Sequence, residues 1–352
     1  MSHIAEIDRN FAALTVEQDG MRTWDVRKAP FSIHGLYRPE EGGVFRRMPQ
    51  EVADTVNDGV KDFCRLTAGG HIRFKTDSKR FVLKWRAPYF CDFPHMPRTG
   101  TAFFDLYANG QHIHTFIPND PKETADGLLA EAMVTLPFDG MNDIVIYFPL
   151  YNAVYDLSLA LEEQATVLPA DPYAHTLPIV YYGSSITHGG CVSRAGMAYP
   201  AILQRRLNTE TVNLGFSGSC RAEPAMADYI AALPMRVFVY DYDHNAPDPA
   251  FLEATHEPFF KQVRKQRPDL PIVMVSAAEA YLPGGWDVRR EIIRRTYENA
   301  VASGDKNVYF LDGHTFYDGA GGRDCLVDNT HPNDLGMWCM ANAMEPLLKK
   351  LL

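Results

Sequence analysis

Over the first 170 positions the apolar residues occur in short runs with little helical periodicity. The runs of strand length are residues 81–85, 104–107, 111–114, 144–148 and 155–162. In the last of these, every second residue is a Tyr or a Leu, the period-2 pattern of a half-buried strand. Asn109-Gly110 separates two of the runs and suits the positive φ values of a two-residue hairpin turn. The pattern predicts an antiparallel β-sandwich.

From about residue 177 the pattern changes to apolar runs that alternate with segments of helical spacing. The apolar runs are residues 179–182, 212–214, 237–240, 272–275 and 308–311. Between them apolar residues recur at helical spacing in 199–207, 259–263 and 288–301, and Leu335, Trp338, Ala341, Met344 and Leu348 form a last stripe. This alternation predicts a parallel sheet covered by helices on both faces.

A proline-rich stretch, residues 168–178, connects the two halves and should resist both helix and strand. We therefore expect an N-terminal sandwich domain over residues 1–170 and a second domain over residues 177–352.

The composition narrows the classes of partner. The chain has 352 residues and a net charge of −10, which argues against nucleic acid. No apolar stretch approaches the roughly 20 residues that span a bilayer, so no membrane is expected. Residues 1–9 lack the features of a signal peptide, and six scattered cysteines form no C-x-x-C pair, so we expect a cytoplasmic protein with free thiols. The oligomeric state stays open.

Polar residues follow three of the predicted strands, at the edge where parallel sheets collect reactive groups. Ser185 follows the first strand and is a candidate nucleophile, although serine is also a common helix N-cap. Gly218 follows the second strand, where its N–H could face an oxyanion or simply form a turn. Asn245 follows the third strand, where its amide could donate to an oxyanion or again form a turn.

Near the C-terminus, Asp328 precedes His331 by three residues. A histidine can act as the base for a hydrolytic serine, and a carboxylate can hold its other ring nitrogen. The alternatives are a solvated surface loop and a capping role before the last helix.

Taken in order, these blocks resemble those of the SGNH (GDSL-like) hydrolases. The resemblance implies a three-layer, flavodoxin-like parallel sheet preceded by an antiparallel, jelly-roll-like β-sandwich. It implies Ser185 as nucleophile, His331 as base, Asp328 as its partner, and Ser185, Gly218 and Asn245 as oxyanion donors. The chain departs from the usual pattern at Ser184, where many members have Asp, and around Asn245, where G-x-N-D is usual.

We therefore expect a serine esterase that hydrolyses small acyl esters, with acetyl esters of carbohydrates suggested by the resemblance. The sandwich would bind sugar or wall the site. The alternatives are an acyltransferase with the same triad, an inactive carbohydrate-binding protein, and a metal-dependent hydrolase. No cofactor or metal is expected, because Asp241, Asp243, His244 and His314 match no ligand spacing. Trp85, Tyr89 and Trp286 could stack on sugars, but a packing role is the stronger expectation.

Overall fold

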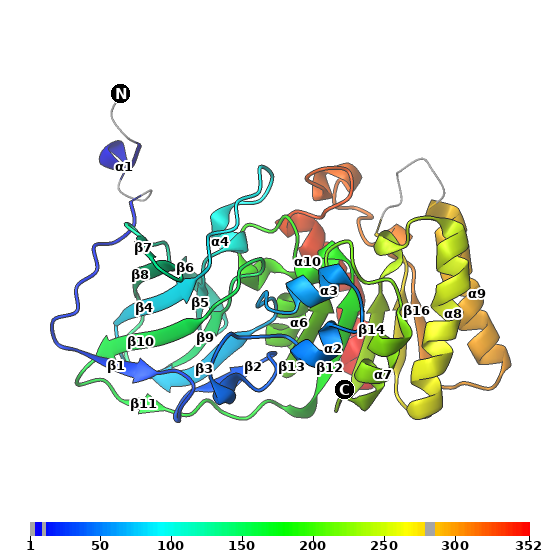
Figure 1. Ribbon diagram of the computed structural model, residues 1–352, viewed down its shortest axis with the longest axis horizontal. Helices are drawn as coiled ribbons and strands as arrows, with labels where there is room; N and C mark the ends of the chain where they lie inside the picture. The colour runs from blue at the N-terminus through cyan, green and yellow to red at the C-terminus, as the bar shows by residue number, and fades with distance from the viewer. Residues whose placement is uncertain (1–3, 9–11, 279–285) are drawn as a thin grey trace.

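A computed structural model describes residues 4–8, 12–278 and 286–352 of the chain (Figure 1). Residues 1–3 and 9 of the N-terminal stretch considered above lie outside the described residues. None of the described helices is both long enough and apolar enough to cross a membrane. All six cysteines are free thiols, as expected.

The first half forms two antiparallel sheets packed face to face, which we call the sandwich domain. One sheet has the order β1 (Met21–Asp25), β10 (Asp156–Glu162), β4 (Arg80–Ala87), β8 (Gly127–Thr135), β7 (Lys122–Thr124). The other has the order β11 (Val167–Leu168), β3 (His71–Thr76), β9 (Asn142–Tyr147), β5 (Asp105–Ala108), β6 (Gln111–Thr115), and β2 (Ser32–His34) pairs with β3. The predicted sandwich is confirmed, and its core buries Trp85 and Phe104 among other large side chains.

The hairpin expected at Asn109-Gly110 joins β5 to β6, and both turn residues have positive φ, 52° and 76°. The first half of the chain also contains short helical segments: α1 (Ile4–Ile7), η2 (Pro39–Glu41), α2 (Gln50–Ala53), α3 (Asp58–Phe63) and α4 (Arg98–Thr101). Figure 1 shows α2 and α3 lying over the second half of the molecule, beside α7 (Pro224–Ala232).

The second half contains a five-stranded parallel sheet, and we call it the parallel-sheet domain. Its strand order is β13 (Thr209–Gly215), β12 (His175–Gly183), β14 (Val237–Asp241), β15 (Ile272–Val275), β16 (Val308–Leu311). This is the flavodoxin-like order, as expected. The other helical segments are α5 (Ser185–His188), η3 (Ala195–Met197), α6 (Tyr199–Leu207), η4 (Asp243–Asn245), α8 (Pro249–Gln266), α9 (Trp286–Ala302), η5 (Gly313–Thr315), η6 (Gly322–Cys325) and α10 (Asp334–Leu351).

Helices cover both faces of the parallel sheet. Successive residues of a strand point to opposite faces, so one strand can contribute to two apolar clusters. Tyr181 and Val239 pack with α6 and α10 in one apolar cluster. Tyr182 and Tyr240 pack with α7, α8 and α9 in another. The three-layer arrangement is therefore confirmed.

The apolar stripes of two helices differ from those read from the sequence. In α10, Leu335 and Trp338 are largely exposed, whereas Met337 and Met340 are buried with Ala341, Met344 and Leu348. The Trp338 ring packs against the Arg206 guanidinium at the surface instead, with 4.0 Å between the guanidinium carbon and the ring centre. In α9, Val288 and Val301 are likewise exposed, and Ile292, Ile293, Thr296 and Ala300 face the core.

The connection between the halves also differs in part from the prediction. Residues 175–178 already belong to β12, with a shift in pairing between His175 and Ile179. Pro178 sits in this irregular stretch, where its missing N–H costs no regular ladder bond, and its carbonyl accepts from the Arg236 N–H.

Candidate active site

Ser185 occupies the corner between β12 and α5. Ser184 is the N-cap, and its hydroxyl accepts from the Ile186 N–H at 3.1 Å. The corner is tight, because a Cβ on Gly183 would lie 2.3 Å from the Asp241 carbonyl oxygen. The capping role considered for Ser185 thus belongs to its neighbour, which leaves the Ser185 hydroxyl available for other contacts.

The structure brings Ser185, His331 and Asp328 together in a line of hydrogen bonds. Ser185 Oγ lies 2.8 Å from His331 Nε2, across 146 positions of sequence. His331 Nδ1 lies 2.7 Å from Asp328 Oδ2. Because a carboxylate can only accept, Nδ1 carries the proton, and Nε2 is left to accept from the serine hydroxyl.

A short loop before α10 fixes the Asp328 carboxylate. Its Oδ1 accepts from the backbone N–H groups of Thr330, at 3.1 Å, and His331, at 2.7 Å. Partial burial opposes ionisation, but the hydrogen bonds from the His331 backbone and imidazole hold the pKa of Asp328 below its usual range. Asn333, and not the residues from Asp328 to His331, caps α10.

The three expected oxyanion donors lie around the same cavity, but their N–H groups differ in direction. The Ser185 N–H, at the start of α5, has no acceptor among the described residues. The Asn245 amide donates one N–H to the Phe216 carbonyl at 3.0 Å, so its second N–H is left over. The Gly218 N–H differs from the expectation: it donates to Asn245 Oδ1 at 3.1 Å and so orients that amide.

The cavity beside Ser185 has a volume of about 450 Å³. From the parallel-sheet domain it is lined by Ser185, Gly190, Cys191, Ser217, Gly218, His244, Asn245, Thr330 and His331. The sandwich domain adds Phe93, His95, Met96 and Tyr151. These four residues could not be predicted from the sequence, because they lie in loops whose position depends on how the domains pack.

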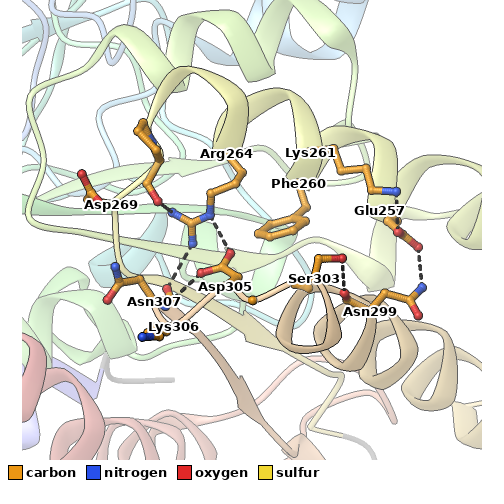
Figure 2. A pocket seen from close by; sticks show the side chains of 13 residues that line it. Glu257, Phe260, Lys261, Arg264, Asp269, Asn299, Ser303, Asp305, Lys306 and Asn307 are labelled. Carbon is orange, nitrogen blue, oxygen red and sulfur yellow. Dashed lines mark hydrogen bonds and ion pairs between the residues drawn. The ribbon is translucent and has the colours of Figure 1, made fainter.

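A second cavity, of about 480 Å³, lies between α8 and α9 (Figure 2). It borders the residues that precede β15 and β16, so it is at the opposite end of the sheet from Ser185. Four of its charged groups form two ion pairs: Arg264 with Asp305 at 2.7 Å, and Lys261 with Glu257 at 2.7 Å. We therefore assign the candidate active site to the Ser185 cavity.

The residues considered as metal ligands do not converge. Asp241 accepts from Thr187 and Tyr199, Asp243 accepts from the Ala277 N–H, and His314 lies beyond β16 in η5. Among the described residues, the groups close enough to share an ion are His95, Cys191, Asp328 and His331, whose ligand atoms lie within 4.8 Å of one another. An ion there would compete with the hydrogen bond between Asp328 and His331.

The three aromatic residues considered for sugar stacking have different surroundings. Trp85 is buried in the sandwich core, as the packing interpretation expects. Tyr89 is exposed but does not line the cavity. Trp286 packs against His244, with 4.9 Å between ring centres, and so supports a cavity residue from behind.

Comparisons with known proteins agree with this architecture. Residues 176–349 match the GDSL-like Lipase/Acylhydrolase family, and residues 21–167 match the family described as the N-terminus of SGNH-hydrolase-type esterases. None of the curated proteins compared with the chain matches it.

Three solved structures share the fold. A GDSL-like lipase from Bacteroides ovatus is 27% identical, with a TM-score of 0.82 over 94% of this chain and 98% of that one. The salicylyl-acyltransferase SsfX3 from a tetracycline biosynthetic pathway is 22% identical, with a TM-score of 0.75 over 94% and 98%. An acetyl xylan esterase from the rumen bacterium Butyrivibrio proteoclasticus is 12% identical, with a TM-score of 0.61 over 94% and 98%. The chain belongs to the SGNH (GDSL-like) hydrolase family, in the subgroup with an N-terminal β-sandwich domain, and is a carboxylic ester hydrolase.

Proposed function

We propose that the protein removes small acyl groups, acetyl above all, from carbohydrate esters, with Ser185 as nucleophile, His331 as base and Asp328 as its orienting partner. The observation that carries the proposal is the line of contacts of 2.8 and 2.7 Å from Ser185 through His331 to Asp328. Its setting, at the carboxyl end of β12 and in an open cavity, gives an ester carbonyl access to the hydroxyl.

The mechanism is a two-step acyl transfer. His331 Nε2 takes the Ser185 proton as Oγ attacks the ester carbonyl, and the Asp328 carboxylate stabilises the imidazolium. The Ser185 N–H and the second N–H of Asn245 donate to the resulting oxyanion, while Gly218 holds Asn245 in place. The imidazolium then protonates the departing alkoxide, and a water repeats the sequence to release the acid.

The acetyl and carbohydrate parts of the proposal rest on resemblance. The acetyl xylan esterase shares the fold over nearly the whole of both chains. The cavity, of about 450 Å³, has room for a short acyl group together with part of a larger alcohol.

An acyltransferase is the second candidate, because the salicylyl-acyltransferase shares both domains with this chain. The same three residues, Ser185, His331 and Asp328, would transfer the acyl group to the hydroxyl group of an acceptor instead of to water. Product analysis with and without candidate sugar acceptors separates the two: an esterase gives free acid throughout, and a transferase gives acylated acceptor.

Labelling with a fluorophosphonate and hydrolysis of p-nitrophenyl acetate test the proposal. Ser185→Ala should abolish both, whereas Ser303→Ala, the same change at the other cavity, should leave both intact. A chelator should have no effect on the wild type. Full activity in Ser185→Ala, or loss of activity with the chelator and its recovery with Zn²⁺, would contradict the mechanism.

A further inference from the structure

Three hydrogen-bonded side chains lie beside the Ser185 cavity, and two of them, Tyr151 and Ser217, line it, whereas His188 is buried behind them. The Tyr151 hydroxyl lies 2.9 Å from Ser217 Oγ, and Ser217 Oγ lies 3.3 Å from His188 Nδ1. The His188 ring stacks on the Tyr151 ring, with 4.2 Å between centres, and its Nε2 lies 2.8 Å from the Leu150 carbonyl oxygen. No step of the proposed mechanism uses these groups.

The position of His188 fixes where its proton is. A carbonyl oxygen can only accept, so Nε2 carries the hydrogen that faces Leu150. Full burial, together with the nearby Arg47 guanidinium, holds the pKa of His188 well below its usual range. The ring is therefore neutral, and Nδ1 is a bare acceptor.

The direction of the other two hydrogen bonds follows. The Ser217 O–H donates to Nδ1, and the Tyr151 O–H donates to Ser217 Oγ. The reverse order would leave the buried Nδ1 without a donor, at a cost of about 1–3 kcal/mol. Both hydroxyl protons are thus donated within this chain of side chains. Tyr151 and Ser217 can therefore only accept hydrogen bonds from a ligand in the cavity.

The Tyr151 hydroxyl oxygen lies close to Ser185 and His331. A Cβ added to Gly190 would lie 3.1 Å from the Tyr151 hydroxyl oxygen, 3.1 Å from the Ser185 carbonyl oxygen and 3.2 Å from His331 Cδ2. The Tyr151 hydroxyl oxygen, the Ser185 carbonyl oxygen and the imidazole thus border the same small space above Gly190. Tyr151, Gly190 and Ser217 all line the same cavity as Ser185.

We propose that Tyr151 Oη and Ser217 Oγ form a hydroxyl-accepting subsite, which selects esters that carry a free hydroxyl on the carbon next to the acylated one. The inference rests on the proposed esterase function and deepens it by naming the substrate class, the monoesters of vicinal diols. An ether oxygen at the same position has no proton to give and meets lone pairs instead.

A pair of matched substrates tests the subsite: 2-hydroxyethyl acetate and 2-methoxyethyl acetate, with rates corrected for their alkaline hydrolysis. In the wild type the hydroxyl compound should have the higher kcat/KM by about tenfold, the worth of one net hydrogen bond. Tyr151→Phe removes one acceptor. Ser217→Ala frees the Tyr151 proton to donate to an ether. Each should lower the ratio to roughly threefold or less.

Because the ratio is taken within each variant, a general loss of activity cancels. Tyr181→Phe is the matched control: its buried hydroxyl has no hydrogen-bond partner among the residues that the structure describes, and it lies on β12 outside the cavity. This variant should keep the wild-type ratio. A wild-type ratio near one, with p-nitrophenyl acetate hydrolysis and Ser185 labelling intact, overturns the subsite alone. Absence of both overturns the esterase mechanism itself.

Discussion

At the residue scale, Asp328 shows how a single proton position controls a whole site. In Asp328→Asn the side-chain oxygen can still accept from the backbone of Thr330 and His331, so the loop should keep its shape. The amide nitrogen, however, would then face His331 Nδ1, which favours the tautomer with the hydrogen on Nε2. That tautomer cannot accept the Ser185 proton, so we expect kcat to fall by about 10³-fold or more with KM little changed.

Steady-state kinetics on p-nitrophenyl acetate measure this loss. Asp324→Asn, an exposed carboxylate four positions earlier in the same loop region, is the control and should keep full activity. A threefold loss or less in Asp328→Asn would mean that the imidazole is oriented by something other than this carboxylate.

Asn245 is a second residue whose contribution can be isolated. Asn245→Ala removes the amide N–H that we assign to the oxyanion and should lower kcat by about a hundredfold or more, on the order of 3 kcal/mol. Asn299→Ala makes the same substitution at the exposed side of the other cavity and should have no effect. An unchanged kcat in Asn245→Ala would assign this amide to the support of the Phe216 loop alone.

Asp243 predicts a pH dependence of stability. Burial raises the pKa of this carboxyl from its usual value of 3.8 to about 6, so the folded chain holds its proton where the unfolded chain releases it. Stability should therefore fall as the pH rises from about 4 to about 6 and then stay level, a penalty on the order of 3 kcal/mol. Asp243→Asn keeps an acceptor for the Ala277 N–H but cannot ionise. Urea unfolding at a series of pH values should show the variant gaining on the wild type over this range; parallel curves would contradict the assignment.

At the scale of elements, the strands that could be predicted from the sequence are those whose own apolar pattern specifies them. The five runs at 179–182, 212–214, 237–240, 272–275 and 308–311 all lie in parallel strands, because a buried strand must be apolar on both faces. Ser185, Gly218, Asn245 and His331 could be picked out because each follows a strand or precedes the last helix.

The features that could not be predicted depend on packing between segments that are far apart in the sequence. Two apolar series overlap in α10. The series with Met337 and Met340 packs in the core cluster, which leaves Trp338 at the surface against Arg206. The direction of the Gly218 N–H depends on Asn245, 27 positions away. His95 and Tyr151 reach the cavity only because the sandwich docks there.

Arg47 joins elements of the two domains at the place where the sandwich packs against the parallel-sheet domain. It enters from the sandwich domain, is buried, and donates to the carbonyls of Asn213 and Gly215 at the end of β13 and of Phe63, the last residue of α3. Arg47→Met would remove the guanidinium donor from all three carbonyls, although the Phe63 carbonyl would keep the Leu66 N–H. We therefore expect the free energy of unfolding to fall by about 3 kcal/mol. Urea denaturation measures the loss. Arg46→Met, the partly exposed neighbour, should cost much less, and equal losses would contradict this role.

At the scale of the whole molecule, apolar residues of both domains pack together in a core cluster. Tyr147, Leu150 and Tyr151 of the sandwich domain pack in the same cluster as Ile186 and Tyr199 of the parallel-sheet domain. Unfolding either domain alone would expose the apolar residues of this cluster to water. We therefore expect the two domains to unfold in one transition, although chains of this length often unfold in several steps.

This coupling can be measured because the tryptophans divide between the domains. With Trp286→Phe and Trp338→Phe combined, fluorescence reports only Trp24 and Trp85 of the sandwich. Far-ultraviolet circular dichroism reports mainly the long helices α8, α9 and α10 of the other domain. If the shared core joins the domains, both signals should change at the same urea concentration, and Arg47→Met should shift the two midpoints together. A sandwich signal that is lost first, with the helices still intact, would mean that the walls contributed by His95 and Tyr151 can leave the active site without unfolding the hydrolase sheet.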